Sequence, residues 1–259
     1  MKRILYISGM FILIAGTIFL PSFTYREHQA KSYTGFQVEV LNVSEQDMIT
    51  EAEIKEIVDR NFGEIKGAPV KGINLLELEE TVLKNPYVSA CEVYQTIDGT
   101  LNLKAMVRKP LVRIINEDLQ QYYLDLNGFA MPISRAHPSH ILVANGHIYD
   151  RFVSIDKSEK PLSSFADTSV IRQIYPIAWH IAQDEFLSSF IDQIYVNERK
   201  EIELVPKIGR QQIIMGTSED AREKLENLKT FYTRVMNKMD WDVYKTINIK
   251  YKNQVVCSK

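Results

Sequence analysis

Three histidines are one group of residues in this chain whose type and spacing could suggest a metal site. His137, His140 and His147 lie close together in the sequence. Their spacing does not place two histidines four residues apart on one helix face, and no cysteine lies beside them, so the usual pattern of a zinc site is missing. We interpret them as histidines of a surface loop, and the sequence predicts no metal site.

Carboxylates form a second candidate group. Glu117, Asp118, Asp125 and Asp150 lie within one stretch of the chain, and a pair of carboxylates can hydrolyse glycosidic bonds. A cell-wall hydrolase acting outside the cytoplasm is therefore an alternative, but the spacing does not pair these acids. The sequence has no G-x-S-x-G, P-loop or G-x-G-x-x-G motif. It predicts no catalytic residue and no cofactor.

The cysteines and tryptophans are interpreted as structural. Cys91 and Cys257 are far apart in sequence and fall in different predicted domains. A disulfide needs two Cα atoms within about 7 Å, so we expect each cysteine to act as a small hydrophobic side chain. Trp179 and Trp241 are expected to be packing residues. Two cysteines in 259 residues also exclude a disulfide-stapled scaffold.

Composition places the chain among ordinary globular proteins. Its 259 residues include 31 Lys and Arg against 33 Asp and Glu, which gives a net charge of −2. Hydrophobic residues make up 45% and charged residues 25%, values that exclude intrinsic disorder. The near-neutral balance argues against a nucleic-acid binder that uses a broad basic surface.

The N-terminus carries an apolar segment. Ile4 to Phe23 contains no charged residue, and about twenty such residues are enough to cross a bilayer core as a helix. A cleaved signal peptide is the alternative, but no good cleavage site follows. We expect an uncleaved anchor over residues 1–24 and a short linker over residues 25–34. With the N-terminus inside, both interpretations place the rest of the chain outside the cytoplasm.

Residues 35–109 show the pattern of a small α+β domain. Thr50 and Glu53 are spaced as a capping box that starts a helix, and Gly63 is placed where that helix would end. Asp98-Gly99 predicts a tight turn between two strands. The predicted order is strand, helix, helix, strand, strand, over these ranges: 36–40, 54–62, 76–84, 88–95 and 101–107.

Residues 110–259 are predicted to be mostly β. Asn127-Gly128 is the strongest hairpin signal. Val170 to Ile181 has a helical pattern that Pro176 either kinks or divides, and a second amphipathic helix runs from Leu225 to Met239. The predicted strands are 112–115, 122–126, 129–133, 141–143, 191–196, 201–205, 211–215 and, as a single last strand, 246–257.

Several motifs in this order resemble a known family. The motifs are Gly72-Ile73-Asn74-Leu75-Leu76, Lys84-Asn85-Pro86-Tyr87-Val88, Asp98-Gly99-Thr100-Leu101, Val107-Arg108-Lys109-Pro110, Tyr122-Tyr123-Leu124-Asp125 and the ending from Ile247 to Val256. The first four resemble a POTRA domain, and together they resemble the bacterial division proteins of the FtsQ (DivIB) family. The resemblance implies an α+β chain with a single N-terminal transmembrane helix, a β-α-α-β-β POTRA domain, and a mostly antiparallel β-domain with flanking helices.

The resemblance also implies a function. Members of the family are non-enzymatic scaffolds anchored in the inner (cytoplasmic) membrane, single-pass, with a cytoplasmic N-terminus. They bind the bitopic partners FtsB and FtsL outside the cytoplasm, link early to late division proteins, and regulate septal wall synthesis. Further division proteins are expected at the POTRA domain, and no nucleic acid is expected. The alternative is another POTRA-containing assembly or secretion factor that acts on extracytoplasmic proteins.

The last predicted strand is the candidate partner site. Its side chains alternate, and a strand at the end of a chain easily becomes a sheet edge to which a partner strand adds. The alternative is an internal strand whose lysines are only solvated. The residues assigned to partner binding are Ile247, Asn248, Ile249, Lys250, Tyr251, Lys252, Asn253 and Val255.

Two further segments are candidates for a role in binding or in domain arrangement. In the POTRA domain, the first strand or the strand Val88 to Gln95 is a second candidate edge, against the alternative that both only build the core. Arg108-Lys109-Pro110 is interpreted either as a stiff connection that sets the angle between domains or as a strand end with solvated charges.

Overall fold

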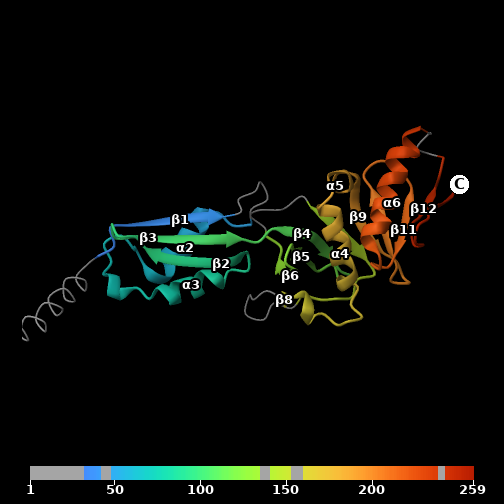
Figure 1. Cartoon of the computed structure of the whole chain (residues 1–259). Helices are drawn as coiled ribbons and strands as arrows, with labels where there is room; N and C mark the ends of the chain where they lie inside the picture. Colours follow the sequence, from blue (N-terminus) through green and yellow to red (C-terminus); the bar gives the residue numbers. More distant parts are fainter. Residues whose placement is uncertain (1–31, 42–47, 135–140, 153–159, 239–242) are drawn as a thin grey trace, which may run out of the picture. The chain divides into compact units, whose positions relative to one another are not determined.

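The computed structural model describes residues 32–41, 48–134, 141–152, 160–238 and 243–259 (Figure 1). The chain divides into two compact units. Unit 1 comprises Met1–Asn42, Thr50–Lys84 and Val88–Met106. Unit 2 comprises Val43–Ile49, Asn85–Tyr87 and Val107–Lys259.

Unit 1 has the predicted order of elements. They are β1 (Gly35–Leu41), α2 (Glu51–Phe62), the 3-10 turn η1 (Val70–Gly72), α3 (Leu75–Leu83), β2 (Val88–Gln95) and β3 (Thr100–Val107). The capping box is confirmed: the Glu53 amide donates to the Thr50 hydroxyl, and the Thr50 amide donates to the Glu53 carboxylate. Gly63 ends α2 at a positive φ of 74°, a conformation that glycine adopts without strain.

The three strands of unit 1 form one sheet in the order β1-β3-β2. β1 runs parallel to β3 in the register Val38↔Leu103. One face of each helix is buried, through Ile54 and Val58 on α2 and Leu78 and Val82 on α3. This order leaves β1 and β2 as the two edges of the sheet.

Unit 2 is built on a mixed sheet of ten strands in the order β13-β12-β11-β10-β9-β7-β4-β5-β6-β8. The strands are β4 (Pro110–Ile115), β5 (Gln121–Asp125), β6 (Phe129–Pro132), β7 (Leu142–Gly146), β8 (Lys160–Pro161), β9 (Ile191–Val196), β10 (Ile202–Pro206), β11 (Gln212–Gly216), β12 (Thr246–Asn248) and β13 (Val256–Ser258). The pairs β4–β7, β7–β9 and β11–β12 are parallel and the others antiparallel.

Helices α4 (Ile171–Ala182), α5 (Glu185–Phe190) and α6 (Ala221–Arg234) complete unit 2, with the 3-10 turns η2 (Leu162–Ser164) and η3 (Met236–Lys238). Buried residues of these helices and of the strands form one hydrophobic core, so the helices cover a face of the sheet. α4 continues through Pro176 as one helix. Figure 1 shows α4 against β4 and β5, and α6 against β11 and β12.

Three expectations from the sequence need correction or a limit. The prediction of a single strand over residues 246–257 is wrong, because the chain forms β12, a turn and β13 instead. Trp179 is 39% exposed and is not a buried packing residue. The expected anchor over residues 1–24, together with His137, His140 and Trp241, lies outside the described residues. Within the described part, no helix has the length and apolar character to cross a membrane.

Candidate partner-binding edge

The C-terminal residues form a small hairpin at one edge of the ten-stranded sheet. β12 pairs with β11 on one side, in the register Ile213↔Ile247, and with β13 on the other, in the register Ile247↔Cys257. β12 is therefore an internal strand. The strand at the edge is β13, which ends one residue before the end of the sequence.

The local sequence explains why the predicted strand turns back. The Asn248 side chain accepts a hydrogen bond from the Lys250 amide at 3.0 Å, a local bond that competes with strand pairing. Asn253 adopts a left-handed conformation with φ of 60°, which asparagine tolerates better than most residues. The polar run from Tyr251 to Gln254 thus forms the turn between β12 and β13.

The predicted site residues separate into a buried and an exposed group. Ile247 and Ile249 are buried in the core of unit 2, and the Ile249 amide donates to the Ile214 carbonyl at 2.9 Å. The alternation expected from the sequence ends there, because Tyr251 is 52% exposed and lies in the turn. Val255 packs partly buried against the core. A partner can therefore reach the turn but not the two isoleucines.

Ion pairs hold the hairpin to the rest of unit 2. Lys250 Nζ lies 2.6 Å from Glu201 Oε1, and this bond lowers the pKa of Glu201 and raises the pKa of Lys250. Lys252 Nζ lies 3.7 Å from Asp220 Oδ2. Gly216 makes room for the first pair, since a Cβ there would lie 2.8 Å from Cγ of Lys250. Both lysines thus form ion pairs with acidic residues of their own unit.

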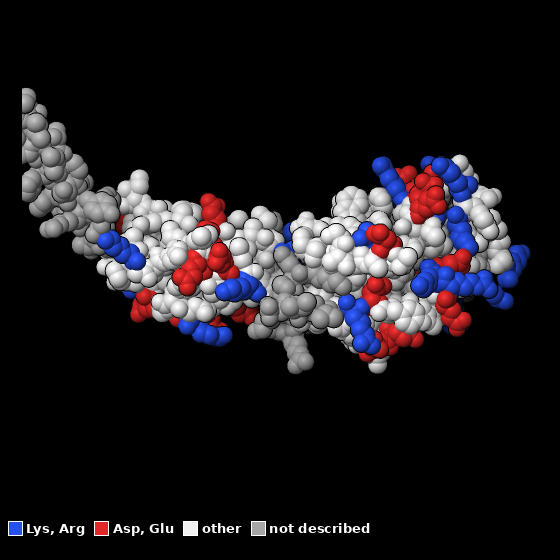
Figure 2. All heavy atoms as spheres, turned by 90° about the horizontal axis from the view of Figure 1, so that it is seen from below, with Lys and Arg blue, Asp and Glu red and all other residues white. Residues whose placement is uncertain are grey.

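The edge strand itself is short and accessible. Val256 is 48% exposed, Ser258 is exposed, and the Cys257 side chain packs partly buried against the core. Burial raises the pKa of the Cys257 thiol. Lys245, Lys252 and Lys259 are exposed on this part of the unit, and Figure 2 shows Lys and Arg side chains interspersed with Asp and Glu at the end that carries β12.

The candidate edge β2 of unit 1 is different, because a helix covers it. The Glu79 carboxylate of α3 accepts a hydrogen bond from the Val93 amide of β2 at 2.7 Å. Burial, together with the Glu79 charge, raises the pKa of Cys91 on the same strand to about 12. β1 is the opposite edge, and the backbone pairing that it shows within the described residues is with β3.

Arg108 and three of the four candidate carboxylates, Asp125, Asp118 and Glu117, form ion pairs in unit 2. Arg108 is 5% exposed, bonds to Asp125 at 2.7 Å and lies over the ring of Phe129 at 4.7 Å. The interpretation of Arg108 as a solvated strand-end charge is therefore wrong. The other pairs are Asp118 with Arg151, and Glu117 with His147; the Asp150 carbonyl accepts from Asn116.

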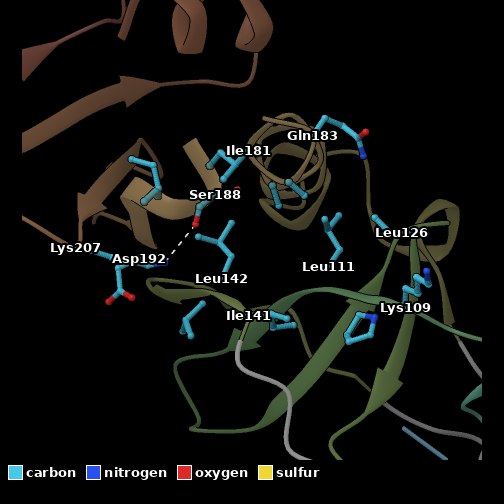
Figure 3. Close-up of a pocket in the computed structure, with 15 residues that line it drawn as sticks. Lys109, Leu111, Leu126, Ile141, Leu142, Ile181, Gln183, Ser188, Asp192 and Lys207 are labelled. Carbon is cyan, nitrogen blue, oxygen red and sulfur yellow. Dashed lines mark hydrogen bonds between the residues drawn. The ribbon is translucent and has the colours of Figure 1, made fainter. Parts of the chain in front are cut away.

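A cavity of about 760 Å³ lies among the described residues of unit 2 (Figure 3). It lies where the parallel strands β4, β7 and β9 begin, under the end of α4. Leu111, Leu142 and Ile181 form part of an aliphatic lining, and Lys207 at the rim donates to the Ser188 carbonyl at 3.3 Å. The described residues contain no group of three or more His, Cys, Asp or Glu side chains that could hold a metal ion.

Comparisons with known proteins decide the family. The family model described as FtsQ/DivIB, C-terminal related, matches residues 109–258, which is more than half of the chain. This chain belongs to the FtsQ/DivIB family. A POTRA-like domain model matches residues 33–106. The chain is also 22% identical, over 253 residues, to the cell division protein FtsQ of Geotalea daltonii (strain DSM 22248 / JCM 15807 / FRC-32), a match that covers 97% of this chain and 80% of that protein.

Membership of the FtsQ/DivIB family supports a role as a non-catalytic cell-division scaffold. Sequence reasoning assigned partner binding to the C-terminal segment, which stays a prediction, and it did not predict that β13 is the edge strand. Asn248 and Asn253 were the available signals, since asparagine followed by a polar run favours a turn. No comparable sequence signal could have predicted that Glu79 binds the edge of β2, because this contact joins two residues that lie on different elements.

Proposed function

We propose that this chain is a membrane-anchored scaffold of the bacterial division complex, with the anchor at residues 1–24, the N-terminus in the cytoplasm and the bulk of the chain outside it. In this proposal β13 accepts an extended strand of an FtsB- or FtsL-like bitopic partner. The chain then links early to late division proteins and regulates septal wall synthesis. No chemical step is assigned to it.

The observation that carries the proposal is the position of β13. It is the last strand in the sheet order, it is exposed at Val256 and Ser258, and it pairs with β12 alone among the described strands. Edge strands with unpaired amides and carbonyls are templates for strand addition. The proposed contact surface is β13 together with Tyr251, Lys252 and Asn253 of the turn.

The strength of such a contact follows from its size. Each added backbone hydrogen bond contributes about 0.5–1.5 kcal/mol net, and β13 has only three residues. Apolar burial against Tyr251 and Val256 would supply more. We therefore expect a modest pairwise affinity that is strengthened when both partners are anchored in one membrane.

Deletion of residues 256–259 tests the proposal directly. The full chain and the deletion variant are placed in lipid nanodiscs and challenged with the extracytoplasmic segments of the FtsB- and FtsL-like proteins of the same organism. We expect the deletion to weaken capture at least about tenfold, which corresponds to the loss of two or three backbone hydrogen bonds.

The matched control removes Lys259 alone, which leaves β13 complete. Circular dichroism establishes that all three proteins are folded. Loss of capture in both variants would assign binding to the terminal charge and not to strand addition. Equal capture by all three proteins would place the partner site elsewhere and overturn the proposed role of β13.

A further inference from the structure

We propose that the end of unit 1 at which the chain enters lies against the bilayer surface, with Ile97 in the lipid headgroup region. This inference rests on the proposed membrane anchor. It concerns a surface that faces lipid, which is separate from the protein-binding edge at β13.

The entering chain is fastened to unit 1 from its first described residues. The Tyr33 amide donates to the Ala68 carbonyl at 2.9 Å, and the Gly67 amide donates to the Tyr33 carbonyl at 2.8 Å. The Thr34 amide donates to the Gly99 carbonyl at 3.0 Å. The Tyr33 ring is 2% exposed. We call this part of unit 1, formed by residues 32–34, 67–69 and 96–100, the entry end.

The sequence limits the distance between the entry end and a bilayer. Eight residues, 24–31, separate the apolar segment from Ser32. Even fully extended they reach at most about 28 Å, and any compaction brings the entry end closer. The headgroup region of one leaflet is itself roughly 5–8 Å deep. The entry end is therefore the part of the described chain that such an anchor holds closest to lipid.

The entry end, and the first turn of α3 beside it, present aliphatic side chains there. Ile97 projects from the turn between β2 and β3 and is fully exposed, at 109% of the reference area. Leu76, 62% exposed, is the second residue of α3. Its position at the same end follows from the bond between Glu79 and Val93: Leu76 is about one helical turn before Glu79, and Ile97 is four residues after Val93.

Exposed charges of both signs, Glu64 and Glu77 as well as Lys66 and Lys71, lie beside the entry end. The Asp98 carboxylate beside Ile97 accepts bonds from the hydroxyls of Thr96 and Thr100, so it is turned back onto its own hairpin. Exposed Lys66 and Lys71 lie in the loop before α3, where they suit anionic headgroups. Figure 2 shows both signs of charge interspersed on the visible face of unit 1, so aliphatic contact and not net charge decides the placement.

Tryptophan quenching by brominated lipid tests the inference. The full chain, with Trp179 and Trp241 replaced by phenylalanine, is reconstituted in vesicles of phosphatidylethanolamine and phosphatidylglycerol that carry bromine near the headgroup end of the acyl chains. Ile97→Trp is compared with Met106→Trp. Met106 is 38% exposed and lies near the far end of β3, six residues from Thr100, or roughly 20 Å along the strand.

We expect the Ile97→Trp variant to lose most of its fluorescence to the brominated lipid and the Met106→Trp variant to lose little. Equal quenching at both positions, or none at position 97, would overturn the inference while leaving the anchor intact. Flotation after an alkaline carbonate wash separates the two proposals. A chain that no longer floats with the vesicles would refute the anchor and this inference with it.

Discussion

The two ends of the ten-stranded sheet are held together in different ways. At β4, β5 and β6, the ion pair between Arg108 and Asp125 is almost fully buried, and Asp125 also accepts the amides of Asn127 and Phe129. At β12 and β13, the pair between Lys250 and Glu201 is about one-third exposed. The first arrangement fixes a turn as part of the core. The second holds a hairpin by contacts that water and a partner can both reach.

Unit 1 adds a third case, the edge strand β2. Its sequence pattern resembles that of any amphipathic strand. However, α3 lies along β2, and the Glu79 carboxylate accepts the hydrogen bond of the Val93 amide. β13 has no such cover among the described residues. The availability of an edge is therefore decided by the neighbouring element and not by the composition of the strand.

The largest effect is expected where the sheet is held by the buried pair. Asp125→Asn keeps the oxygen that accepts the Asn127 and Phe129 amides but removes the charge that faces Arg108. Leaving a buried charge without its partner costs about 3–5 kcal/mol. We expect unit 2 to lose about that much unfolding free energy, measured by urea denaturation.

The matched control is Asp118→Asn, which removes the partner of Arg151 at a site where both side chains are more than half exposed. Exposed pairs of this kind contribute less than about 1 kcal/mol. A similar loss in the two variants would show that burial does not distinguish the two ends of the sheet, and the comparison would fail.

These contacts also mark how far the sequence can predict the fold. The capping box at Thr50 and the turns at Asp98-Gly99 and Asn127-Gly128 are local, so residue type and spacing were enough to predict them. The prediction of the last strand was wrong beyond Asn248, because the alternation of apolar and polar residues in the sequence continues through residues that form a turn. Contacts such as Arg108 with Asp125 depend on the folded positions of distant segments, which no local pattern encodes.

A smaller effect is expected where α3 covers β2. Glu79→Ala leaves the Val93 amide without its carboxylate partner, and an unsatisfied backbone group costs about 1–3 kcal/mol. We expect unit 1 to lose unfolding free energy in that range and the pKa of Cys91 to fall, because the Glu79 charge contributes to raising it. Urea denaturation and thiol titration measure the two effects.

Glu80→Ala is the control, since it makes the same change at the next, exposed residue of α3. If Glu79→Ala also begins to self-associate, the cover on β2 is a guard against strand addition. Identical stability and an identical Cys91 pKa in the two variants would mean that Glu79 does not protect this edge.

The smallest effect is expected at the C-terminal hairpin, and it depends on pH. The hydrogen bond from Lys250 holds the pKa of Glu201 below its ordinary value of about 4.3. A lowered folded-state pKa contributes stability that is present above the unfolded pKa and is lost as the pH falls through the folded pKa. Glu201→Gln should therefore unfold at a lower urea concentration than the wild type at pH 7, and the difference should shrink below about pH 4.

The control is Glu198→Gln, an exposed neighbour in the same loop, which should match the wild type throughout. A difference that stays constant with pH would show that packing, and not the ion pair, fixes the hairpin, and the two ends of the sheet would then be held by the same kind of contact.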